Sequence, residues 1–134
     1  MPALEFPIRF DRAFQVWSYS VSHSVLLLRS NQSIAHPTRI DLMFRAVGEL
    51  RLRSRLEGLT VDLASMSQLS NELNEIQVSR GDSIFTLSSD DFARGYVVAS
   101  AMYLSEDALS YGEPSTIDNP DLTHAVIRSG YFSP

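Results

Sequence analysis

Apolar and polar residues alternate with a period of two in several short segments, and this spacing predicts β-strands. The expected strands cover residues 14–21, 25–30, 38–45, 49–57, 59–63, 83–89 and 96–105. One stretch differs, because Met66, Leu69, Leu73 and Ile76 recur at helical spacing and predict a helix near 65–76. We therefore expect a mainly β fold of about seven strands with one helix, an antiparallel barrel or sandwich. An α+β layer, with the helix over one sheet face, is the alternative.

The region 14–30 is too long for one strand, so a break is expected in it. Ser22-His23-Ser24 is the natural turn, which makes 14–21 and 25–30 a hairpin. In a regular strand Trp17, Tyr19 and Val21 share one face. The run Val25-Leu26-Leu27-Leu28 has no polar alternation and predicts a strand that is covered on both faces.

A second hairpin is expected between residues 38–45 and 49–57, with Gly48 as the left-handed residue of the loop. It places five arginines near one another on one sheet face: Arg51, Arg53 and Arg55 on one strand, and Arg39 and Arg45 on the other. Such a face can bind an acidic protein or a phosphate. It can also be a solvated face that Asp41, Glu49 and Glu57 balance.

The 134 residues, 44% of them hydrophobic, predict one globular domain over 1–134, with 107–134 as a loosely structured C-terminal arm. An edge strand is expected in this arm near 125–128. The chain has no cysteine, which excludes disulfides, thiolate metal sites and thiol nucleophiles. No signal-like or membrane-spanning apolar run occurs, so we expect a soluble cytoplasmic protein.

Charge is distributed unevenly along the chain. Residues 1–60 hold eight arginines against five acids, whereas residues 61–134 hold three arginines against eleven acids. All eleven basic residues are arginine, and the net charge is −5. This balance argues against nucleic acid as a partner, and it favours a protein partner or self-association.

The residues that carry chemistry do not form a known catalytic pattern. His23 lies between two serines, but neighbouring side chains of a strand point to opposite faces, so we interpret it as structural. The histidines His23, His36 and His124 sit in unrelated segments, and no metal site is predicted. The six glycines are isolated, so no phosphate-cradling loop and no cofactor is expected.

Two functional hypotheses follow. The first is a non-enzymatic protein that binds a protein partner through Arg51, Arg53 and Arg55 with Arg39 and Arg45. Its size and composition are like those of bacterial accessory or immunity proteins. The second is a small-ligand barrel or enzyme whose pocket contains Trp17, Tyr19 and His23, with Arg29 holding an anion.

Overall fold

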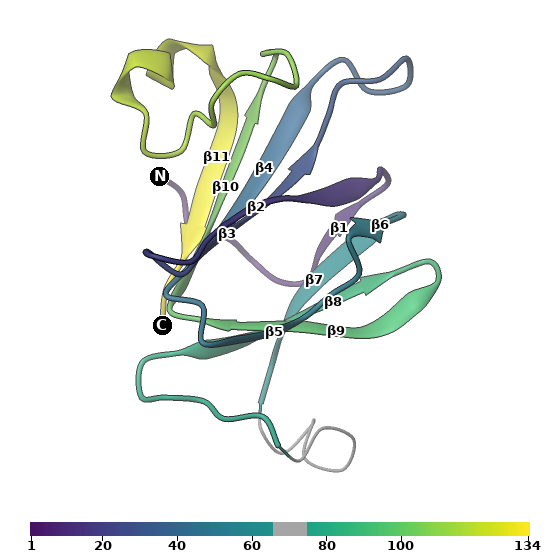
Figure 1. Ribbon diagram of the computed structural model, residues 1–134. Coiled ribbons are helices and arrows are strands. Elements are labelled where there is room, and N and C mark those ends of the chain that lie inside the picture. Colours follow the sequence, from purple (N-terminus) through teal and green to yellow (C-terminus); the bar gives the residue numbers. More distant parts are fainter. Residues whose placement is uncertain (66–74) are drawn as a thin grey trace.

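Two antiparallel sheets pack face to face as a sandwich that does not close into a barrel (Figure 1). The computed structural model describes residues 1–65 and 75–134. The strands are β1 (Ile8–Phe10), β2 (Phe14–Ser20), β3 (Val25–Ser30), β4 (Arg39–Arg45), β5 (Glu49–Arg51), β6 (Arg55–Leu56), β7 (Leu59–Ala64), β8 (Ser83–Ser89), β9 (Phe92–Ala99), β10 (Ala101–Asp107) and β11 (Val126–Phe132). The mainly β fold confirms the prediction. The predicted helix near 65–76 lies outside the described residues except at its ends.

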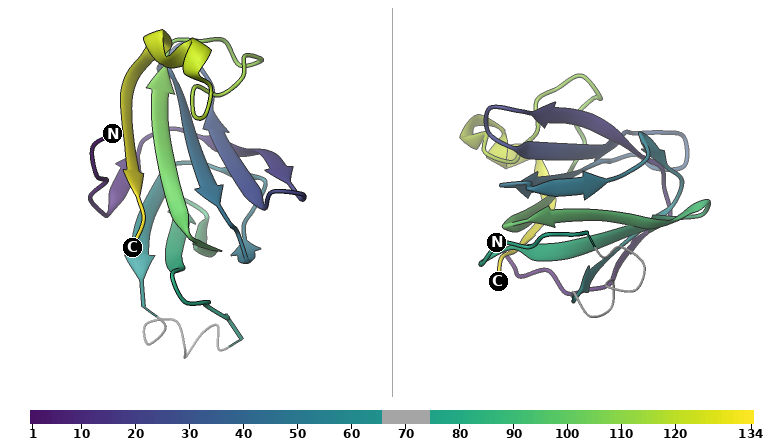
Figure 2. Two further views of the ribbon diagram at one scale, coloured as in Figure 1. Left: turned by 90° about the vertical axis from the view of Figure 1, so that its left-hand side faces the viewer. Right: turned by 60° about the horizontal axis from the view of Figure 1, so that its bottom comes forward.

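Chain segments cross between the two sheets at both flanks of the sandwich. The sheet orders are β11-β10-β4-β3-β2-β6 and β1-β7-β8-β9-β5. At one flank, Leu4 bonds the backbone of Tyr131 in β11, and the chain then enters the other sheet as β1 (Figure 2). At the opposite flank, β5 pairs with β9 in one sheet and β6 pairs with β2 in the other. Each flank is therefore spanned by one continuous segment.

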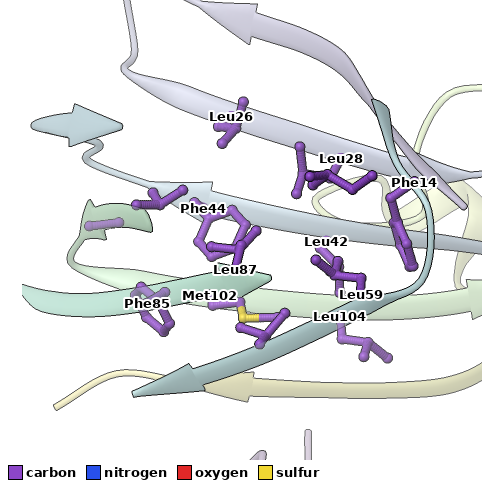
Figure 3. Packing of buried hydrophobic residues seen from close by; sticks show 14 of the residues in the cluster. Phe14, Leu26, Leu28, Leu42, Phe44, Leu59, Phe85, Leu87, Met102 and Leu104 are labelled. Carbon is purple, nitrogen blue, oxygen red and sulfur yellow. The ribbon is translucent and has the colours of Figure 1, made fainter. Parts of the chain in front are cut away.

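The inner faces of both sheets form one apolar core (Figure 3). Every second residue of the central strands points into it, as the period of two predicts. Phe85 lies near the middle, with ring centroids of Phe44, Phe132 and Phe6 at 5.3, 5.9 and 6.2 Å. Phe85 itself is fully buried. Rings from β4, from β11 and from the N-terminal segment thus meet at this one side chain.

The expected hairpin of 14–21 and 25–30 is confirmed as β2 and β3, with the turn at residues 21–24. Leu26 and Leu28 enter the core, and Leu27 is buried on the other face, so β3 is covered on both sides. A bulge interrupts β2, because Val16 pairs with Leu28 and Ser18 with Leu27, which leaves Trp17 as the extra residue. The alternation expected for β2 therefore changes at Trp17.

The hairpin expected between residues 38–45 and 49–57 is wrong. Strand β4 pairs with β3 and β10, whereas β5 pairs with β9 in the other sheet. Residues 46–48 carry the chain from one sheet to the other, and Gly48 donates its N–H to the Val98 carbonyl. The left-handed residue is Ala46, with φ of 53°, rather than Gly48.

The segment after Asp107 returns to the six-stranded sheet. Residues 108–118 lie over its outer face, followed by the 3-10 helix η1 (Pro120–Ala125) and β11, which pairs along β10 from Met102 to Asp107. No helix within the described ranges combines the length and the apolar composition needed to cross a membrane.

Candidate functional site

The arginines Arg51, Arg53 and Arg55 are all exposed along the segment that links β5 to β6, and we call them the arginine flank. The guanidinium groups of Arg51 and Arg53 lie over the ring of Phe92, at 5.1 and 4.8 Å from its centroid. Arg53 pairs with Asp91 at 3.1 Å, and Arg55 pairs with Glu57 at 2.6 Å. All four of these paired side chains are more than half exposed, so water screens both ion pairs.

Close backbone contacts fix the position of the arginine flank. Gly95 lies where a Cβ atom would come within 2.5 Å of the Leu87 carbonyl oxygen and 3.2 Å of the Arg51 carbonyl oxygen. A side chain at this position would clash with β8 and crowd β5, so the glycine permits both strands to lie this close to β9. Further along the segment, the Ser54 carbonyl accepts a hydrogen bond from Val16 in β2. The arginines therefore project from a segment that is held by both sheets.

Tyr96 anchors the start of this segment through a side-chain hydrogen bond. Its hydroxyl donates to Glu49 at 2.6 Å, and burial followed by this hydrogen bond raises the pKa of Tyr96 to about 12. Because an unfolded tyrosine titrates at about pH 10, the folded state holds this proton more tightly. The resulting stabilisation is complete below that pH, and it is lost as the pH rises towards the folded pKa.

We expect Tyr96, one of the five tyrosines, to lose its proton at about pH 12 in the folded protein. An alkaline titration followed by phenolate absorbance measures this step. The Tyr96→Phe variant should lack this late step and show a shallower loss of stability above pH 10. Identical titration curves for the two proteins would contradict the assignment.

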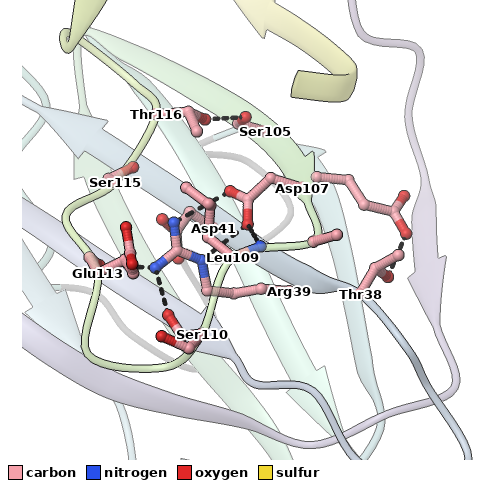
Figure 4. Close-up of polar contacts among 12 residues, drawn as sticks. Thr38, Arg39, Asp41, Ser105, Asp107, Leu109, Ser110, Glu113, Ser115 and Thr116 are labelled. Atoms are coloured by element: carbon pink, nitrogen blue, oxygen red, sulfur yellow. Dashed lines mark hydrogen bonds and ion pairs between the residues drawn. The ribbon is translucent and has the colours of Figure 1, made fainter. Parts of the chain in front are cut away.

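Arg39 and Arg45 do not join the arginine flank, because β4 lies in the other sheet. Arg39 is fully buried and forms a two-bond ion pair with Asp107, at 3.0 and 3.1 Å (Figure 4). Its remaining donors reach the carbonyls of Ser110, Glu113 and Pro114. All five N–H groups of Arg39 are therefore used within the protein. Arg45 pairs with Asp118 and stacks over Tyr103 at 4.6 Å.

Arg29 has a similar place on the outer face of the six-stranded sheet. It is 2% exposed and pairs with the buried Asp41 through bonds of 2.7 and 3.0 Å. It also donates to the carbonyls of Tyr111 and Glu113. Arg29 and Arg39, each paired with a buried aspartate, thus hold residues 110–114 against the sheet. Arg29, which was expected to hold an anion, is therefore already paired with the carboxylate of Asp41.

The aromatic residues of the alternative pocket are placed apart by the bulge in β2. The Trp17 ring lies on the outer face, under Arg29 at 4.9 Å and at the edge of Tyr111 at 6.3 Å. Tyr19 is opposite Leu26, a core residue, so it points to the inner side. His23 is exposed in the turn, with Nδ1 at 2.9 Å from the Ser22 hydroxyl. The common face expected for Trp17 and Tyr19 is therefore not formed.

Three residues that contact the arginine flank, or that contact or lie in the loop between β3 and β4, were not predicted from the sequence as site residues. Phe92 supports two arginines, Arg12 binds the loop between β3 and β4, and His36 lies in that loop. Phe92 follows an acidic pair and looks like a turn residue, while Arg12 and His36 lie outside periodic segments. Their importance depends on pairings between distant segments.

Comparisons with protein-family models, with curated proteins and with solved structures found no match.

Proposed function

We propose that this protein acts by binding rather than by catalysis, and that the arginine flank binds an acidic segment of a protein partner. The observation that carries this proposal is the pair of guanidinium groups over Phe92, whose Cζ atoms lie 5.1 Å (Arg51) and 4.8 Å (Arg53) from the ring centroid. A guanidinium group that lies over a ring still has the N–H groups on its edge, and such an edge matches a carboxylate. In Arg51 one of these groups, on Nη1, already donates to the Arg94 carbonyl at 2.9 Å. Little side-chain entropy is then lost when a carboxylate binds.

The charge distribution supports an acidic partner at this flank in particular. The whole chain carries a net charge of −5, so an acidic segment is repelled by most of the protein. Asp91 and Glu57 hold Arg53 and Arg55 only through exposed pairs, which contribute about 0–1 kcal/mol each. A partner carboxylate can replace either of them at small cost.

The test uses a fluorescent peptide of alternating glutamate and glycine, with a glutamine version as the neutral control. We expect the glutamate peptide to bind at low salt and to dissociate as ionic strength increases. The Arg51→Gln/Arg53→Gln/Arg55→Gln variant should bind it at least about tenfold more weakly, as measured by fluorescence anisotropy. The matched control is Arg9→Gln/Arg80→Gln/Arg128→Gln, which makes the same charge change on other exposed arginines.

Equal losses in the two triple variants would show a net-charge effect and would overturn the proposal. Light scattering at low and high salt identifies the case in which the partner is a second copy of this chain. In that case a dimer separates both at high salt and in the Arg51→Gln/Arg53→Gln/Arg55→Gln variant, because the acidic half of the chain, residues 61–134, is the occupant.

A further inference from the structure

A polar depression of about 300 Å³ lies where β2 begins and β3 ends. Its lining includes His36, the side-chain amides of Gln15, Asn31 and Gln32, and the three arginines Arg12, Arg29 and Arg55. Arg29 is already paired with Asp41, so Arg12 and Arg55 are the arginines that remain for a ligand. Among the described residues that line it there is no carboxylate. The volume is at the lower end of the range for small-molecule sites.

Arg12 forms a fixed cationic wall of this depression. Its Nε donates to the Ser30 hydroxyl at 2.6 Å, its Nη2 donates to the carbonyls of Asn31 and Thr38, and its Nη1 donates to the Thr38 hydroxyl at 3.2 Å. One N–H group of Nη1 is left for a ligand. Burial lowers the pKa of Arg12, and the nearby charge of Glu106 opposes that shift. Arginine stays charged in proteins, so this wall keeps a positive charge that is only partly hydrated. A half-buried cation of this kind attracts an anion more strongly than a fully exposed one does.

His36 and Arg55 come from two further segments. The backbone of His36 makes two hydrogen bonds with Ser33, at 2.8 and 3.2 Å, so its half-buried ring is held in the lining. Arg55 lies on β6 opposite Gln15, and its Nε donates to Glu57 at 2.6 Å. Three donors of hydrogen bonds to anions thus converge from residues that are distant in sequence.

A second, more open depression adjoins the first. It is lined by Val16, Trp17 and Ser54, and it shares Gln15 and Arg55 with the first one. Val16 and Trp17 are each 37% exposed there, so they offer apolar surface beside the cationic site. We propose that the two depressions together bind a small molecule that has an oxyanion group and an aromatic or apolar group. The oxyanion, a phosphate or a carboxylate, lies among Arg12, His36 and Arg55, and the apolar group lies against Trp17.

The test is isothermal calorimetry with phenyl phosphate, inorganic phosphate and benzoate. We expect phenyl phosphate or benzoate to bind saturably, and the arm that binds identifies the phosphate or the carboxylate. The His36→Gln and Arg55→Gln variants should each weaken that binding about tenfold, since each removes a hydrogen bond to a charged group. The bound probe should also change the fluorescence of Trp17, which is the only tryptophan of the chain.

The apolar contact has its own measurement. If phenyl phosphate is the probe that binds, it should bind about tenfold more tightly than inorganic phosphate, and Trp17→Ala should remove that difference. If benzoate is the probe that binds, Trp17→Ala should weaken it to the same extent. No saturable binding of either aromatic probe, or equal binding by the wild type, His36→Gln and Arg55→Gln, overturns the proposal. Urea unfolding of each variant verifies that it is folded, and Arg12 is left unchanged because it holds the loop after β3.

This inference stands apart from the proposed protein-binding function, although Arg55 belongs to both surfaces. The Arg51→Gln/Arg53→Gln variant should bind the acidic peptide weakly and the small oxyanion probe normally. His36→Gln should show the opposite behaviour. Failure of one proposal is therefore distinguishable from failure of the other.

Discussion

The Asp107→Asn variant is expected to lose about 3–5 kcal/mol of its free energy of unfolding, because it leaves the charge of Arg39 buried without its carboxylate. Both side chains of this pair are fully buried. Arg39 also donates to three carbonyls of residues 110–114, so a displaced guanidinium loosens the segment over the sheet as well. Urea unfolding followed by circular dichroism measures the loss.

Two companion variants isolate the cause. Asp118→Asn removes the partner of Arg45 in a pair that is 34% and 61% exposed, and it should cost less than about 1 kcal/mol. Arg39→Met/Asp107→Leu replaces both charges by apolar groups, and it should be more stable than Asp107→Asn. A loss for Asp107→Asn as small as that for Asp118→Asn would mean that the buried pair is solvated in solution.

The Phe85→Ala variant is expected to lose about 3–5 kcal/mol, because a ring at the centre of the core is replaced by a cavity. Phe85 contacts the rings of Phe6, Phe44 and Phe132. The variant should therefore also weaken the attachment of the N-terminal segment and β11. Urea unfolding measures the loss, and hydrogen exchange of these two segments locates it.

Ile34→Ala is the control for Phe85→Ala, because Ile34 is fully exposed and its truncation should change stability by no more than about 0.5 kcal/mol. Phe85→Leu, which keeps part of the buried apolar volume, should lie between the two. An ordering in which Phe85→Leu is as unstable as Phe85→Ala would indicate that the shape of the ring matters more than its volume.

The alternation of apolar residues predicted where most strands lie, because it depends only on neighbouring positions. Strand β8 follows this local rule, and β2 follows it up to the bulge at Trp17. Strand β3 was predicted from its unbroken apolar run instead. Strand β1 has only three residues, Ile8–Phe10, and is too short to show a pattern. The pairing of β4 was not predictable in the same way, since two segments close in sequence resemble a hairpin whether or not they share a sheet.

The same limit applies to the candidate site. The exposure of Arg51, Arg53 and Arg55 agrees with the polar side of their segment. Arg39 has the same alternating pattern and is completely buried, because Asp107 lies opposite it and residues 110–114 cover it. Periodicity separates the two faces of a strand, but a polar face is buried or exposed according to distant residues. The polar depression brings together Arg12, His36 and Arg55 from three segments that are distant in sequence, so no local pattern predicts it.

The segment that runs from β5 to β6 is bonded to one sheet through β9 and to the other through β2. Arg51, Arg53 and Arg55 are therefore held in this arrangement only when both sheets are folded and packed together. A partner that binds there selects the folded chain, and by mass action it raises the midpoint of thermal unfolding. At a free partner concentration one hundred times the dissociation constant, the stabilisation is about 2.7 kcal/mol. Candidate partners can therefore be ranked by melting curves of the unlabelled protein alone.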